Sequence, residues 1–413
     1  MLDCLNSNMT LPAPSTPPPL NLEDYDVWPE RGFLPRRDPL PALNPPWPAT
    51  LTELAETLPK LLGARQFRSY IQEHALALPP RGAAEDDENR CAGRILSFAG
   101  HGYIWEDPQQ PADRIPATLA VAWHQVMKQL GRPPVLSYAS YALDNWRRLD
   151  PDKPIALGNI VLLQNFLGGL DEEWFVLVHV DIEANAGPAL AGIVKAQEAA
   201  LRDSPDEVTR YLERVASAEE QMRNTLLRMP ERCDPYIYYN RVRPYIHGWK
   251  DNPVLPRGLV YEGVEEYHGQ PQQFRGETGA QSSIIPSLDA GLGVTHEDDP
   301  LRHYLNEMRD YMPPKHRRFM EALERMKDAQ GRGLLYGYAR DRRSRHANLW
   351  KAFRDCVHLL GRFRETHLDY ADRYIHRQSQ RSASNPTEVG TGGTPFMVYL
   401  KKHLEETDRM IAE

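Results

Sequence analysis

The amino-acid sequence predicts an all-α fold, and three features of the pattern support this prediction. Apolar residues recur at steps of three and four through long windows, the spacing of one face of a helix. No window alternates apolar and polar residues between hairpin turns, as half-buried strands do. Clusters of Gly, Pro and small polar residues separate the windows. The helical windows are 51–62, 116–131, 171–203, 205–228, 300–328, 347–377 and 396–411.

The segment before the first window is rich in proline, with 12 of the 36 prolines in the first 50 residues. Proline lacks a backbone N–H and fixes its own φ, so this segment suits neither a helix nor a sheet interior. We expect residues 1–21 to form a flexible arm and the remainder to lie extended along the body. Further along the chain, loops are expected at 80–93, 105–113, 229–235, 250–300 and 377–395.

Composition and charge exclude several classes of protein. The stretch 154–170 has no charged residue, but it contains Asn, Gln and Gly and does not suit a membrane span. The net charge is −8, from 49 basic and 57 acidic residues, and no basic cluster dominates any segment. We therefore expect neither nucleic acid nor a membrane as a partner.

The N-terminus and the cysteines predict the compartment. The first ten residues include Asp3 and no apolar run, so we expect no signal peptide. The four cysteines are widely scattered and form no C-x-x-C pair, which fits neither a disulfide framework nor a zinc site. A reducing cytoplasm is the compartment that these features predict.

His367 is the strongest candidate for chemistry. It lies on an apolar stripe of the window 347–377, and Arg364 lies directly beside that stripe. One interpretation is a core histidine that bonds to a backbone carbonyl. The other is an axial ligand of haem iron, because haem requires an imidazole, apolar walls and a cation for a propionate. The stripe consists of Phe353, Val357, Leu360, Phe363, His367, Tyr370, Ala371 and Tyr374.

His367 and Asp369 also spell the H-x-D of mononuclear iron oxygenases. Residues two apart on a helix point about 200° away from each other, so these two side chains do not coordinate the same metal ion. The sequence contains no HExxH, GxSxG or P-loop motif, so hydrolase and nucleotide-driven functions have no residues to support them.

Two further segments combine residue types that suit a ligand. Aromatics and arginines interleave in 236–245, which fits either a wall for an aromatic ligand with an arginine for its carboxylate, or an aromatic core with solvated arginines. Residues 390–394 read Gly-Thr-Gly-Gly-Thr before the last helical window. Such glycines either gather backbone N–H groups around an anion or form a flexible linker. Spacing alone leaves both alternatives open.

The succession of motifs resembles that of the indoleamine 2,3-dioxygenases. The match follows the family's order from about residue 25 to the end of the chain, which makes it more specific than any single motif. The motifs are NW (145–146), DPDKP (150–154), GWKDNP (248–253), LVYEG (259–263), GAQSS (279–283), MRDYMPPKHR (308–317), RETHL (364–368) and GTGGT (390–394).

The resemblance implies a helical haem b protein in which a smaller N-terminal domain, 22–158, caps a large haem domain, 159–413. By this resemblance, His367 is the proximal ligand of the haem iron, and Arg364 with Asp289 lies at the haem edge.

On the substrate side, the resemblance implies that Arg243 holds the substrate carboxylate and that Tyr238 and Tyr239 meet the indole. It also implies that Thr391 lies in a loop that closes over the substrate. Animal members of the family have phenylalanines at the two tyrosine positions and a small Gly-Gly-Ser-Ala run where 276–279 reads Gly-Glu-Thr-Gly. A bulkier and more polar pocket is therefore expected here.

Trp123, His124, Val178 and His179 fall near the distal region by the same resemblance. Whether either histidine faces the iron stays open at this point, and we expect a structural role for both.

The implied protein is a cytoplasmic, monomeric haem b dioxygenase with a small-molecule indole substrate and O2 as its partners. It inserts both oxygen atoms across the indole C2–C3 bond of tryptophan or a related indole, giving N-formylkynurenine. One alternative is a different oxidative rearrangement, as in the related enzyme of pyrrolnitrin biosynthesis, which acts on a chlorinated tryptophan. Another is a haem-binding or signalling relative without catalysis.

Overall fold

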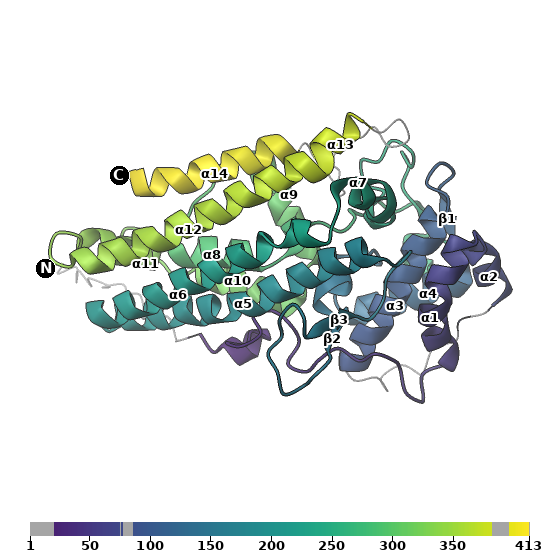
Figure 1. Ribbon diagram of the computed structural model, residues 1–413, viewed down its shortest axis with the longest axis horizontal. Coiled ribbons are helices and arrows are strands. Elements are labelled where there is room, and N and C mark those ends of the chain that lie inside the picture. The colour runs from purple at the N-terminus through teal and green to yellow at the C-terminus, as the bar shows by residue number, and fades with distance from the viewer. Residues whose placement is uncertain (1–19, 75, 77–85, 382–395, 413) are drawn as a thin grey trace, which may run out of the picture.

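Helices joined by loops make up the structure, and this confirms the all-α prediction (Figure 1). The computed structural model describes residues 20–74, 76, 86–381 and 396–412. The helices are α1 (Ala49–Gly63), α2 (Phe67–Glu73), α3 (Asp86–Trp105), α4 (Ala117–Gln129), α5 (Leu170–Leu201), α6 (Pro205–Leu226), α7 (Pro235–Ile237), α8 (Ile284–Leu292), α9 (Pro300–Met308), α10 (Pro314–Glu324), α11 (Leu334–Asp341), α12 (Ala347–Ala371), α13 (Arg377–Ser379) and α14 (Phe396–Ala412). Three π-helical turns add to them at Ala139–Leu143, Tyr238–Val242 and Asp372–His376.

Four short strands form two small pairs. Strands β1 (Arg114–Ile115) and β4 (Val260–Tyr261) pair in parallel, with Arg114 opposite Val260. Strands β2 (Trp146–Arg148) and β3 (Ile160–Leu162) pair antiparallel, with Trp146 opposite Leu162. The β1–β4 pair joins segments far apart in the chain, whereas β2 and β3 are close in sequence. Strands this short do not form a stable sheet of their own.

Three parts of the helical pattern differ from the expectations. Helix α3 begins inside the expected loop 80–93, and it is buried nearly all round, so its sequence shows no single apolar stripe. Helix α8 lies within the expected loop 250–300, and Pro286 fits there because the first turn of a helix needs no N–H donor. The window 300–328 forms two helices, since Pro313 and Pro314 end one pattern and start the next.

Helices α5, α6, α12 and α14 form the long side of the molecule and lie beside one another in that order (Figure 1). Helix α5 is apolar on two faces. Val176, Leu177 and Val180 pack into a hydrophobic cluster with α1, α3 and α4, whereas Val178 and Ile182 pack into a second cluster with α6, α8 and α12. This helix therefore joins the two cores.

The two clusters bear on the predicted domains. The first cluster holds most of the apolar residues of 34–166, but it also includes Trp249 and Tyr261 from later in the chain. The boundary between 22–158 and 159–413 therefore remains a prediction, and residues 1–19 of the predicted arm lie outside the described residues. Among the helices that the structure describes, none is both long enough and apolar enough to cross a membrane.

Gly100 provides a test of the packing between α3 and α4. A Cβ added at Gly100 would lie 2.2 Å from the ring of Trp123, which is fully buried. We expect Gly100→Ala to lower the free energy of unfolding by about 1–3 kcal/mol, because an overpacked core shifts its neighbours. Urea unfolding measures this change. The control is Gly63→Ala at the end of α1, where a Cβ meets no atom within 4 Å. A similar loss in both variants would contradict the packing described here.

Candidate functional site

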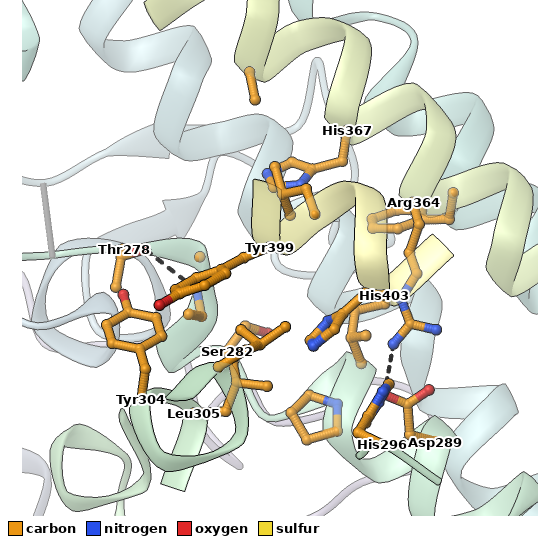
Figure 2. A pocket seen from close by; sticks show the side chains of 18 of the residues that line it. Thr278, Ser282, Asp289, His296, Tyr304, Leu305, Arg364, His367, Tyr399 and His403 are labelled. Carbon is orange, nitrogen blue, oxygen red and sulfur yellow. Dashed lines mark hydrogen bonds and ion pairs between the residues drawn. The ribbon is translucent and has the colours of Figure 1, made fainter. Parts of the chain in front are cut away.

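A cavity of about 520 Å³ lies between α12, α14, α8, α9 and the start of α5 (Figure 2). This volume is in the usual range for small-molecule and cofactor sites. Its walls are mainly apolar, with a few polar groups facing inward. The apolar and aromatic lining includes Phe175, Leu226, Met229, Val294, Leu301, Phe363, Ile375 and Tyr399.

His367 lies on the cavity side of α12, and its ring points into the cavity (Figure 2). Although the side chain lies deep in the protein, it is accessible to solvent because it faces this open space. Burial, together with the nearby His179, lowers the pKa of His367 to about 4, so the imidazole is neutral near pH 7. Among the described residues, none forms a hydrogen bond with either ring nitrogen. The structure thus offers no support for the alternative of a histidine bonded to a backbone carbonyl.

Arg364 and Asp289 meet at the edge of this cavity, one helical turn from His367. Arg364 Nη2 lies 2.6 Å from Asp289 Oδ2, and Arg364 Nη1 donates to Thr407 Oγ1 at 2.5 Å. Burial on its own would raise the pKa of Asp289, but the charges and hydrogen bonds of Arg364 and His296 lower it below its usual range. This pair therefore links α8, α12 and α14 through charged contacts.

His296 extends the same network to the C-terminal helix. Its Nε2 lies 3.2 Å from Asp289 Oδ2, and its Nδ1 lies 2.5 Å from Glu406 Oε2. Burial lowers the pKa of His296, but the hydrogen bond and charge of Asp289, with the Glu406 bond, outweigh it and raise the pKa. The imidazole thus acts as a cationic bridge between two carboxylates.

His296, His403 and Glu406 also place ligand atoms within 4.8 Å of one another. The two imidazole rings stack, with centroids 4.3 Å apart and an interplanar angle of 21°. Stacked rings direct their nitrogens along parallel planes, whereas metal ligands converge on one point. Lys402 also lies 3.8 Å from Glu406 and competes for its charge. We therefore interpret this group as part of the ion network that holds α14.

Tyr238, Tyr239 and Arg243 lie close together, but only Tyr238 is a lining residue of the cavity. Tyr239 and Arg243 are fully buried behind it, with the guanidinium carbon of Arg243 5.1 Å from the Tyr239 ring centroid. Arg243 Nη1 lies 3.1 Å from His247 Nε2. Arg241 is exposed and donates to the Leu167 carbonyl, so the two arginines have different surroundings.

The local sequence explains how this segment folds. Asp234 caps the short helix α7 by accepting from the backbone N–H groups of Tyr236 and Ile237. A π-helical turn starts at Tyr238, and Pro244 then breaks the α-helical ladder because it has no N–H to donate. π turns often occur at functional sites. Here the turn brings Tyr238 to the cavity wall.

The distal candidates separate in the structure. His179 lines the cavity, and its Nδ1 bonds to the Phe175 carbonyl at 2.7 Å. His124 is half-buried elsewhere, with its Nε2 3.4 Å from Glu266. Trp123 and Val178 are fully buried in the two cores. Of these two histidines, His179 is therefore the one that shares the cavity with His367.

Thr391 and the rest of the segment 390–394 lie outside the described residues. In contrast, the structure brings in groups to which the sequence interpretation assigned no role. Glu277, Tyr304, Tyr399 and His403 all line the cavity. For Glu277, the one signal in the sequence was the departure of 276–279 from the animal pattern. Tyr304 on α9, and Tyr399 and His403 on α14, gave no signal because they resemble ordinary amphipathic helix positions.

The His296 bridge predicts how stability depends on pH. Because the folded state raises the pKa of His296, its contribution to the free energy of unfolding is complete below the usual pKa of 6.5 and is lost as the pH rises through the raised pKa. We expect His296→Gln to remove this alkaline loss. Urea unfolding at about pH 6 and about pH 9 measures the difference. The control is His303→Gln, an exposed histidine 3.9 Å from Asp298, which should behave as wild type. Parallel pH profiles for wild type and His296→Gln would refute the bridge.

Comparison with known proteins identifies the family. A model of the family described as indoleamine 2,3-dioxygenase matches residues 21–410. Indoleamine 2,3-dioxygenase 2 of Homo sapiens is 32% identical over 410 residues, covering 96% of this chain and 97% of its own. An indoleamine 2,3-dioxygenase of Aspergillus candidus is 34% identical over 396 residues, covering 92% and 95%. A myoglobin of Haliotis madaka is 30% identical over 397 residues, covering 95% and 99%. The chain therefore belongs to the indoleamine 2,3-dioxygenase family.

Proposed function

We propose that this protein is a haem b dioxygenase that inserts both atoms of O2 across the indole C2–C3 bond of tryptophan or a related indole. The product is then N-formylkynurenine. Membership of the family indicates haem binding and a dioxygenase type of oxidoreductase, and the haem type, substrate and product are our proposal. The observation that carries it is His367, a neutral imidazole that faces a large apolar cavity and has a cation one turn away.

The residues around the cavity fit haem. His367 offers a free lone pair to an iron atom, and the apolar walls suit the flat macrocycle. Arg364 supplies the cation for a propionate. Asp289 Oδ1 and His403 Nε2 are buried without a hydrogen-bond partner among the described residues. These two atoms at the cavity edge can therefore form hydrogen bonds with a bound group. When bound, haem supplies the redox chemistry with O2.

The protein's own part is to hold and orient the substrate. The bond from His179 Nδ1–H to the Phe175 carbonyl fixes the tautomer and leaves Nε2 as an acceptor. Burial lowers the pKa of His179, so the ring stays neutral. We propose that this acceptor holds the indole N–H and that Tyr238 packs against the ring. The walls exclude water and keep the reacting atoms in place.

Arg243 is our proposal for the substrate carboxylate, and Tyr239 is the aromatic ring against which its guanidinium packs. The charge of Arg243 acts on Tyr238, which lines the cavity, and this supports a place close to the bound ligand. Thr391 keeps its predicted role in a loop that closes over the substrate. We further propose a monomer in the cytoplasm, which agrees with the three buried free cysteines of the described residues, Cys91, Cys233 and Cys356.

A second candidate function is haem binding without turnover. The myoglobin of Haliotis madaka covers nearly the whole of this chain at an identity close to that of the dioxygenases. Proteins named dioxygenase and a protein named myoglobin are thus both similar to this chain along nearly its whole length. A different oxidative rearrangement of a tryptophan derivative is the third possibility that the sequence left open.

One assay separates these functions. Reduced, haem-loaded protein is mixed with L-tryptophan in air, and the product is identified by its mass. N-formylkynurenine supports the proposal, haem without any product supports the non-catalytic alternative, and another product supports the rearrangement.

We expect His367→Ala to fold but to lose haem and turnover, because no other described histidine of α12 faces the cavity. Wild-type haem content and turnover in this variant would refute the ligand assignment.

The carboxylate role of Arg243 predicts a selective loss of affinity. A guanidinium-carboxylate pair away from water typically contributes about 1.5–3 kcal/mol, so Arg243→Ala should weaken L-tryptophan roughly ten- to a hundred-fold. Tryptamine, which lacks the carboxylate, should bind almost unchanged. The dissociation constants follow from spectral or calorimetric titration. Arg241→Ala is the matched control, because Arg241 is exposed and bonds to the Leu167 carbonyl. Equal weakening of both ligands by Arg243→Ala would show that the assigned role is wrong.

A further inference from the structure

Glu277 occupies a position that the backbone fixes firmly. Its N–H donates to the Ile246 carbonyl at 3.0 Å, and Trp249 N–H donates to the Phe274 carbonyl at 2.9 Å. Between these bonds, Gly276 and Gly248 approach so closely that a Cβ on Gly276 would lie 2.2 Å from the Gly248 nitrogen. The two segments are therefore locked together, and Glu277 is held against the turn that carries Arg243.

The side chain of Glu277 lines the cavity, and the residue is only 4% exposed. Burial, followed by the charge of Glu277, raises the pKa of Tyr238, whereas the charge of Arg243 lowers it. Glu277 and Tyr238 both line the cavity, so the acid and the aromatic ring face the same space. A carboxyl group in such a place is costly to bury, and strongly perturbed groups of this kind concentrate at functional sites.

From this placement we infer that Glu277 is a specificity-determining residue that binds an alkyl-ammonium group of the ligand beside Tyr238. The inference rests on the proposed function and assigns the recognition of the side-chain ammonium to Glu277. Together with Arg243, which the proposed function assigns to a carboxylate, Glu277 would match the two charges of an amino acid.

The charge state of the acid agrees with this role. Burial raises the pKa of Glu277 to about 8, so the carboxyl group is mostly protonated at neutral pH in the unliganded cavity. An ammonium brought alongside favours the ionised form, and the pair then forms a charge-assisted hydrogen bond in a region with little water. A ligand carboxylate at the same place would meet repulsion instead.

Three indoles that carry different end groups on a two-carbon side chain test the inference on the haem-loaded full chain. Tryptamine carries an ammonium, 3-ethylindole is neutral, and indole-3-propionate carries a carboxylate. We expect wild-type protein to bind tryptamine at least about tenfold more tightly than 3-ethylindole, and Glu277→Gln to abolish that preference. Glu277→Asp should retain part of it. Affinities are measured by calorimetric titration, with haem content and melting temperature recorded for each variant.

The control variant is Glu262→Gln, the same substitution at a surface carboxylate 3.2 Å from Arg114. It should leave all three affinities within about threefold of wild type. A wild type that does not distinguish tryptamine from 3-ethylindole would overturn the inference, and so would equal weakening of all three indoles by Glu277→Gln. If none of the three indoles, nor L-tryptophan, bound to the haem-loaded wild type, the proposed function itself would fail. Wild-type turnover of L-tryptophan with no effect of Glu277→Gln on tryptamine would overturn the inference alone.

Discussion

The structure depends on keeping an open cavity in front of one neutral imidazole. A protein interior is normally close-packed, and an empty space in it costs stability because the lining atoms lose their contacts. Here the walls are held apart by elements that are each anchored elsewhere. Helix α12 packs on α6 through its apolar stripe, and α5 packs into both hydrophobic cores. His367 can face open space because these helices are fixed independently of it.

The ion network at the cavity edge also holds the helices around the cavity in place. Arg364, Asp289, His296 and Glu406 form a chain of charged contacts from α12 to α8 and on to α14. Buried ion pairs add little net stability, since their attraction is offset by the loss of hydration. They do fix geometry, because a buried charge that leaves its partner is strongly disfavoured. The network therefore sets where α14 lies over the cavity more than how stable the protein is.

The sequence predicted those parts of the structure that follow from local periodicity. The stripe on α12, with His367 within it and Arg364 beside it, is such a case, because each helical position sets its own direction. Helix α3 was missed because it is buried on all sides and has no polar face to reveal its period. The pairing of Arg364 with Asp289 came from the resemblance. The His296 bridge and the place of Glu277 depend on contacts between segments far apart in the chain, which spacing does not encode.

The side of the cavity away from α12 is where function within this family can diverge. An axial imidazole and apolar walls suit haem proteins that bind O2 and haem proteins that react with it. These features therefore do not distinguish the relatives named dioxygenase from the relative named myoglobin. The choice rests on groups that hold a second ligand. In our proposal those groups are His179, whose Nδ1 bonds to the Phe175 carbonyl, and Glu277, whose backbone is fixed by its bond to the Ile246 carbonyl. A site built only to store O2 has no need for a buried acid, whose burial costs stability. In our proposal, the position of Glu277 on the cavity wall is what separates a protein that binds a charged organic substrate from one that binds O2 alone.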